Sequence, residues 1–212
     1  MSGADGYRRM RTGGRPVAGM LSARFDEALA YASALHRGQF RKSTRIPYVS
    51  HLMSVCALAL EAGADEDQAI AALLHDALED QGHRTSASEI ARRFGDRVAR
   101  IVVACSDTDD DFAPWHVRKE EYLEHLETAD EEVLLVSRAD KLHNARAILI
   151  DLREYGPAMW RRFHAGPKAQ LWYYASLAEV FARRLPGQQT DELVRTVAAI
   201  ASETERPWDV VG

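Results

Sequence analysis

Four titratable side chains crowd into the stretch ALLHDALED, namely His75, Asp76, Glu79 and Asp80. Residues three and four apart share one face of a helix, so these side chains are predicted to form a single polar edge. Carboxylates this close together would repel one another and raise their pKa values unless a cation neutralised them. The spacing therefore indicates a bound metal ion as the simplest physical explanation.

Two further segments carry side chains that could complete such a site. Asp140 and Asn144 lie in SRADKLHNARAIL, an otherwise apolar helical pattern, and His51 opens the apolar helical pattern after the loop RKSTRIPYVS. Together these segments supply a His/Asp cluster, which consists of His51, His75, Asp76 and Asp140. Such a mixed set suits Mn²⁺, Fe²⁺ or Zn²⁺ and leaves coordination positions open for water and substrate. Open positions indicate catalysis rather than a structural role.

Each motif also has a simpler interpretation. An adjacent His–Asp pair is common by chance, and a basic turn such as FRKST is often only solvated. The conjunction of His51, the HDALED stretch and Asp140 in one helical domain is hard to explain by solvation. His143 is interpreted as a packed histidine, or one that supports a ligand, rather than as a ligand itself.

The elements that must position these groups are predicted to be helices throughout. Apolar residues recur at helical spacing from Leu21 onward, and Gly, Pro and capping residues punctuate them, with no alternating strand pair. The predicted helices cover residues 23–36, 49–63, 65–80, 86–95, 96–107, 116–127, 130–156, 169–185 and 191–204. The fold class is therefore all-α, a compact bundle of about eight to ten helices.

The amino-acid composition indicates what kind of protein this is and which partners it is not expected to bind. The 212 residues are 46% hydrophobic and 28% charged, which suits one globular domain with a sizeable core. A formal net charge of -5 argues against nucleic acid and anionic membranes as partners. Cys56 and Cys105 make no CxxC motif and are expected in the core. Because no signal peptide or membrane span is evident, a cytoplasmic location is expected.

The domain is expected to span residues 21–206. Residues 1–20 are rich in Gly and Arg and are predicted to form a flexible tail, and residues 207–212 a short second one. The run from Asp109 to Asp111 is most simply an exposed acidic loop. The final stretch, RRLPGQQTDELVRTVAAIASET, could form the seam of a homodimer or could close the domain core, and the pattern leaves both open.

The motifs ALHRGQFRKSTRIPYVSHL, AALLHDALED and RADKLHNARAI resemble the successive signatures of the HD-domain hydrolases of the RelA/SpoT homologue group, which degrade the alarmone (p)ppGpp. The resemblance covers residues 23–152. It implies that the His/Asp cluster binds a metal ion, usually a single Mn²⁺. It also implies that Glu79 and Asp80 activate or orient the attacking water. The implied substrate-binding residues are Arg41, Lys42, Ser43, Asn144 and Tyr174, although an aromatic core position is the competing interpretation of Tyr174.

Several departures from the family pattern touch the substrate pocket. Thr44 stands where glycine is frequent, Leu52 where proline often follows the histidine, and Ala147 where threonine is frequent. The chain is expected to be a stand-alone small alarmone hydrolase, similar to the metazoan SpoT homologue, because it is too short for a synthetase domain.

The resemblance implies removal of the 3′-pyrophosphate of ppGpp or pppGpp, a small-molecule nucleotide substrate, to give GDP or GTP and pyrophosphate. Two alternatives stay open. One is a broader nucleotide phosphohydrolase, such as an NADPH phosphatase, and the other is a non-catalytic alarmone sensor. The acidic pair Glu79 and Asp80 argues against the sensor, which would not need to activate water.

Overall fold

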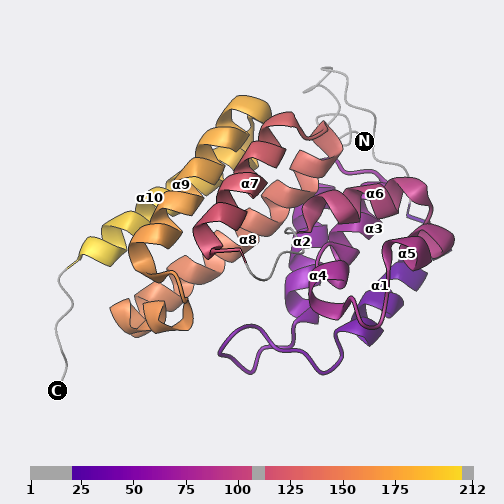
Figure 1. Cartoon of the computed structure of the whole chain (residues 1–212), viewed down its shortest axis with the longest axis horizontal. Coiled ribbons are helices and arrows are strands. Elements are labelled where there is room, and N and C mark those ends of the chain that lie inside the picture. The colour runs from indigo at the N-terminus through magenta and orange to yellow at the C-terminus, as the bar shows by residue number, and fades with distance from the viewer. Residues whose placement is uncertain (1–20, 107–112, 207–212) are drawn as a thin grey trace, which may run out of the picture.

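The computed structural model describes residues 21–106 and 113–206, and over these residues the chain is helical (Figure 1). The elements are α1 (Ala23–Leu35), α2 (Val49–Glu61), α3 (Glu66–Leu74), α4 (Ala77–Gln81), α5 (Ala87–Phe94), α6 (Asp96–Cys105), α7 (Trp115–Thr128), α8 (Glu131–Tyr155), the 3₁₀ helix η1 (Gly156–Arg162), α9 (Gly166–Arg184) and α10 (Gln188–Glu205). The predicted all-α class is confirmed. The two predicted tails and the acidic run at 109–111 lie outside the described residues. None of the described helices is long and apolar enough to cross a membrane.

Capping side chains set the beginnings of the first helices. The Ser22 hydroxyl accepts a hydrogen bond from the backbone N–H of Arg24 at the start of α1. Asp65 and Gln68 form a reciprocal capping box at the start of α3. Gly95 separates α5 from α6 with φ at 94°, a conformation that L side chains rarely adopt. Local chemistry therefore explains why this half of the chain consists of short helices.

The prediction of one continuous helix over residues 65–80 is wrong, because the helix breaks at His75 and Asp76. Helix α3 ends at Leu74 and α4 begins at Ala77. The Nδ1 atom of His75 lies 2.9 Å from the carbonyl oxygen of Ala72, which in a continuous helix would accept the N–H of Asp76. The imidazole competes for that carbonyl. The break aims both side chains at neighbouring helices instead of along one helix edge.

The core is organised around α8. This 25-residue helix packs against α2, α3, α6, α9 and α10, and every residue from Val133 to Asp140 is buried. In Figure 1 the helices α1 to α6 gather at one end and α9 and α10 at the other, with α8 running from one group into the other. Since residues 133–140 of α8 are buried, a charged side chain in this stretch needs partners among the neighbouring side chains.

The last helix closes the domain core. Leu193, Val197 and Ile200 of α10 are buried, and α10 packs against α8 and α9. Of the two roles considered for the C-terminal stretch, these contacts favour core closure for this helix face.

Candidate active site

Two histidines and two aspartates converge from separate helices. His51 lies in the first turn of α2, His75 and Asp76 lie at the break between α3 and α4, and Asp140 lies in buried α8. Candidate ligand atoms of His51, His75 and Asp76 all lie within 4.8 Å of one another. The Oδ1 atom of Asp140 lies 3.2 Å from Nε2 of His51 and 3.6 Å from Nε2 of His75. The structure therefore brings the whole His/Asp cluster together.

The arrangement around His75 suits a cation. Because a carbonyl oxygen only accepts, its contact with the Ala72 oxygen places the ring proton on Nδ1 and leaves Nε2 with a lone pair in the neutral imidazole. That Nε2 atom is buried and has no hydrogen-bond partner among the described residues, although Oδ2 of Asp76 lies 3.0 Å away. Burial opposes the charged imidazolium, but Asp76 and Asp140 outweigh it and raise the pKa of His75 well above its ordinary value. The lone pair of His75 Nε2 faces the carboxylate oxygens of Asp76 and Asp140, and either a proton or a divalent ion between them would offset their repulsion. These nitrogen and oxygen atoms are therefore a set of ligands that fits a metal ion.

His51 is oriented in a similar way. Its Nδ1 atom lies 2.8 Å from Nδ1 of His143, while its Nε2 atom faces the carboxylates of Asp76 and Asp140 at 3.4 and 3.2 Å. Burial and the neighbouring imidazole of His51 lower the pKa of His143 to about 4. His143 is therefore uncharged at neutral pH and can accept the N–H of His51. Such a hydrogen bond fixes the ring of a metal-binding histidine, which is the supporting position that the sequence suggested for His143.

The two aspartates are also held by neighbours. The Tyr48 hydroxyl donates to Oδ2 of Asp76 at 2.6 Å. The Lys141 ammonium donates to Oδ2 of Asp140 at 2.8 Å, and the Asn144 amide donates to its Oδ1 at 2.5 Å. Burial would raise the carboxyl pKa values, but the facing histidines, and Lys141 beside Asp140, hold the pKa values of both aspartates well below their ordinary range. Both side chains are therefore ionised.

Glu79 and Asp80 line the cleft beside the cluster. Glu79 is exposed, whereas Asp80 is half-buried and accepts a hydrogen bond from Nε2 of Gln39 at 2.8 Å. The Oε1 atom of Gln39 accepts from Gln81 at 2.7 Å and lies 2.7 Å from Nδ1 of His36. Burial and a neighbouring carboxylate raise the pKa of Asp80. A carboxylate with a raised pKa is a stronger proton acceptor.

The loop between α1 and α2 forms one wall of the cleft. Its stem is closed by an isolated bridge between Phe40 and Pro47 and by a hydrogen bond from Arg41 N–H to the carbonyl of Ile46 at 2.8 Å. The Arg41 guanidinium donates to Oδ1 of Asn144 at 2.6 Å, so this loop is tied to α8. Arg41 and Lys42 both line the cleft, as their predicted role requires.

Ser43 lies at the exposed tip of this loop and is not among the residues that line the cleft. Its φ angle is 58°, so it makes the turn in a left-handed conformation. Thr44 lines the cleft instead, and its hydroxyl donates to the carbonyl of Arg41 at 2.9 Å. The structure therefore gives no support to a substrate contact by Ser43.

An open cleft of about 680 Å³ lies over the cluster, a size that suits a nucleotide. Tyr174 lines it from α9 while being only 8% exposed, so this side chain packs in the core and still reaches the cleft. Phe40, Ile46 and Ile150 bring exposed apolar surface to the cleft. Of the two cysteines expected in the core, Cys56 is buried there, and Cys105 is half-buried, packs against the core and also lines the cleft.

The sequence motifs did not reveal Gln39 and Tyr48. Both lie at the stem of the loop, where Tyr48 N–H donates to the carbonyl of Gln39 at 2.9 Å. From this stem they reach Asp80 and Asp76 respectively. Neither residue type signals metal chemistry, so only their place beside the FRKST turn could have drawn attention to them.

A helical domain with a buried His/Asp cluster of this kind defines a class of metal-dependent protein. The HD-domain family model matches residues 28–161, which include the entire cluster. The chain belongs to the HD-domain family.

Comparison with individual proteins shows which members of the HD-domain family this chain is similar to. The chain is 36% identical over 137 residues to guanosine-3′,5′-bis(diphosphate) 3′-pyrophosphohydrolase MESH1 of Xenopus tropicalis. The aligned region covers 63% of this chain and 72% of that relative. The Drosophila melanogaster protein of the same name is 37% identical over 142 residues, covering 66% and 75%. Among solved structures, a metazoan ortholog of SpoT that hydrolyzes ppGpp and plays a role in starvation responses is similar with a TM-score of 0.69 and 27% identity, covering 85% of this chain and 97% of that one. The resemblance seen in the motifs is confirmed.

Proposed function

We propose that this chain is a metal-dependent hydrolase that removes the 3′-pyrophosphate of ppGpp or pppGpp. The observation that carries the proposal is the buried His/Asp cluster at the floor of a nucleotide-sized cleft, with the Glu79 and Asp80 carboxylates beside it. Relatives that are named for this activity and match most of their own length support the choice of substrate.

The His/Asp cluster would hold one divalent ion, for which we propose Mn²⁺. Imidazole and carboxylate ligands together suit this ion and its neighbours in the transition series. When bound, the ion would polarise the phosphoryl group and lower the pKa of a nearby water. Tyr48, His143 and Lys141 keep the ligand side chains in place through the hydrogen bonds described above.

The acidic pair would position the attacking water and take up its proton. The raised pKa of Asp80 and its hydrogen bond from Gln39 favour Asp80 as the proton acceptor, with Glu79 orienting the water. The water oxygen forms a bond to the phosphorus next to the ribose, and the bond from that phosphorus to the ribose 3′ oxygen breaks. The 3′ oxygen takes up a proton, so the products are GDP or GTP and pyrophosphate.

Arg41 and Lys42 would offset the charge of the substrate. Arg41 offers a planar fork whose direction is set by its hydrogen bond to Asn144, whereas Lys42 offers a compact point charge. Tyr174 would provide an apolar wall for the nucleoside.

Product analysis of the purified protein tests the proposal. With Mn²⁺ present, ppGpp, pppGpp, NADPH and GTP would be offered side by side, and we expect GDP and pyrophosphate from ppGpp. A chelator should stop this turnover and added Mn²⁺ should restore it. Turnover of NADPH alone would contradict the proposed substrate, and metal-loaded protein without any turnover would contradict the proposed catalysis.

A further inference from the structure

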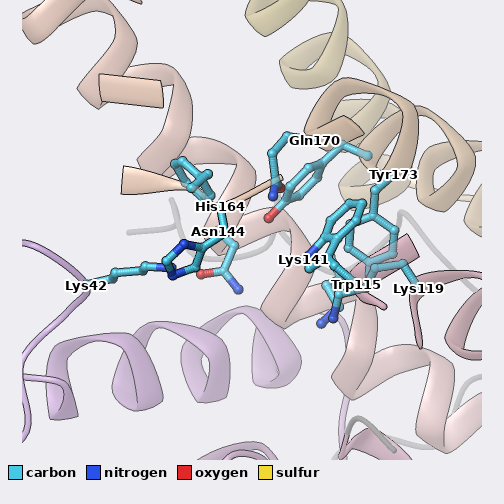
Figure 2. A pocket seen from close by; sticks show the side chains of 10 residues that line it. Lys42, Trp115, Lys119, Lys141, Asn144, His164, Gln170 and Tyr173 are labelled. Carbon is cyan, nitrogen blue, oxygen red and sulfur yellow. The ribbon is translucent and has the colours of Figure 1, made fainter. Parts of the chain in front are cut away.

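The side chains around the cleft fall into an open part and a buried part. The open part includes a small cavity of about 240 Å³ beside the cleft, and Lys42, Lys141 and Asn144 line both spaces (Figure 2). This cavity is therefore a part of the substrate site. The buried part contains the imidazole of His36, which is 2% exposed and lines neither space. His36 has no part in the reaction proposed above, yet it lies against a residue that reaches Asp80.

The end of α1 is fastened to the segment that follows α4. His36 is the C-cap residue of α1. The Arg84 guanidinium donates to the carbonyls of the last two residues of α1, and the Tyr31 hydroxyl donates to Oγ1 of Thr85 at 2.8 Å. Because α4 carries Asp80, these contacts fix the imidazole of His36 relative to that carboxylate.

The hydrogen bonds of the Gln39 amide can be assigned one after another. The ionised Asp80 carboxylate only accepts, so the Gln39 group that lies 2.8 Å from it is the NH₂ group. The carbonyl oxygen of Gln39 points the other way, and it too can only accept. Nδ1 of His36 and Nε2 of Gln81 each lie 2.7 Å from this oxygen, so both must donate to it. His36 therefore carries a ring proton on Nδ1.

The other ring nitrogen of His36 agrees with this assignment. Burial lowers the pKa of His36, so the imidazole is neutral at neutral pH and carries one proton. Nε2 is buried and has no hydrogen-bond partner among the described residues. A proton on Nε2 would leave that N–H unpaired and would set two lone pairs against each other at the contact with Gln39. The form with the proton on Nδ1 avoids both costs.

His36 makes a second contact, which depends on its ring and not on its proton. The ring stacks on that of Tyr48, with the ring centres 5.3 Å apart and the planes 15° from parallel. Tyr48 in turn donates to Asp76 of the His/Asp cluster. The stacking needs a flat ring, whereas the contact with Gln39 needs a donor at Nδ1. Substitutions can therefore separate the two contacts.

We propose that His36 is a positioning residue that holds the Gln39 amide with its NH₂ group directed at Asp80. This inference rests on the proposed function, in which Asp80 takes up the proton of the attacking water. Without the Nδ1 proton, the oxygen of Gln39 would keep only the hydrogen bond from Gln81, and the amide could turn away from Asp80. A carboxylate that is less well oriented would slow the chemical step and leave substrate binding almost unchanged.

The test uses two substitutions that separate the donor from the ring. His36→Phe keeps a ring that can stack on Tyr48 but removes the donor, whereas His36→Asn places an amide NH₂ near the former place of Nδ1 and removes the ring. We expect His36→Phe to lower kcat for ppGpp by about three- to tenfold with little change in KM, the usual effect of one lost hydrogen bond. His36→Asn should recover most of this loss. Metal content should stay at the wild-type level in both variants, and His83→Phe, at an exposed histidine, should change neither quantity.

A double substitution tests whether His36 acts through Gln39. In a Gln39→Ala protein, the further change His36→Phe should lower kcat by less than about twofold, because the amide that His36 orients is already gone. Losses that multiply in full would contradict the proposal. An unchanged kcat in His36→Phe would also contradict it. A His36→Asn protein as slow as His36→Phe would show that the stacking on Tyr48 matters instead of the donor.

The position of the proton can be measured without any turnover. Wild-type protein that does not hydrolyse ppGpp would refute the proposed function, and His36 would then be judged by nitrogen-15 NMR of the imidazole groups. Protein loaded with Zn²⁺, which is diamagnetic, suits this measurement, and the signal lost in His36→Phe assigns the ring. We expect the proton on Nδ1 at neutral pH. A neutral ring with its proton on Nε2 would overturn the proposal, because Nδ1 would then accept and the Gln39 oxygen would face Asp80.

Discussion

The His/Asp cluster and the loop that faces it are built in different ways. His51, His75 and Asp140 are at most 5% exposed, they come from packed helices, and each is oriented by a partner of its own. The loop from 37 to 47 is largely exposed and is held by a few backbone hydrogen bonds and by the Arg41–Asn144 contact. The difference indicates that the core fixes the geometry of the cluster, whereas the loop that we propose to contact the substrate is a segment where substitutions cost little stability.

The largest effect is expected within the cluster. His75→Gln should remove the bound metal and lower turnover of ppGpp by at least about 10³-fold, because the ion supplies most of the chemistry. His83→Gln is the matched control, since His83 is exposed and lies outside the cleft. Metal analysis and steady-state kinetics on both variants test this. Full metal content and turnover in His75→Gln would show that the cluster is not the metal site.

The acidic pair should separate metal binding from catalysis. Asp80→Asn is expected to lower kcat by about 10²- to 10⁴-fold while the metal content stays at the wild-type level, because a proton acceptor is lost and no ligand is. Glu79→Gln should cost less, since Asp80 is the carboxylate whose pKa is raised. If Glu79→Gln proved the more damaging change, the two roles would be exchanged.

Gln39 joins the two regions, so it should show an intermediate effect. Gln39→Ala removes the donor to Asp80 at the stem of the loop and should lower kcat by about tenfold with little change in KM. Gln39→Glu keeps the shape but replaces the donor with a second carboxylate, so it should be no better than alanine. Gln188→Ala, at an exposed position in α10, is the control. A loss confined to KM would mean that Gln39 contacts substrate instead.

The smallest effect is expected at the tip of the loop. Ser43→Gly should change the free energy of unfolding by less than about 1 kcal/mol, because glycine tolerates the left-handed conformation but costs more entropy on folding. The kcat/KM value should change by less than about twofold, within the range typical of an exposed surface position. A KM raised tenfold would place Ser43 in the substrate site after all.

The part that the sequence predicted well depends on short-range regularities. Helical periodicity predicted the helices from α1 to α10 because each buries an apolar face in an ordinary way. The residue types of the His/Asp cluster also predicted that its four side chains lie together, and the structure brings them within reach of one another. The family resemblance then suggested the substrate that we propose.

The features of the fold and site that the sequence did not predict depend mainly on contacts between segments that are distant in the sequence. The break at His75 comes from a side chain competing for a backbone carbonyl, which periodicity does not register. The hydrogen bonds from Tyr48 and Gln39 depend on how the loop stem closes. Lys119 of α7 also lines the cleft. The sequence could not assign it to the site, because the packing of α7 against α9 brings it beside Tyr173.

The break between α3 and α4 also matters to anyone who would transplant this site into another scaffold. His75 owes its orientation to the carbonyl of Ala72, in the last full turn of α3. Grafting the side chains of the His/Asp cluster onto an uninterrupted helix would leave that carbonyl engaged in the helix ladder and would free the imidazole to rotate. A working transplant would have to carry the joint between the two helices along with the ligands.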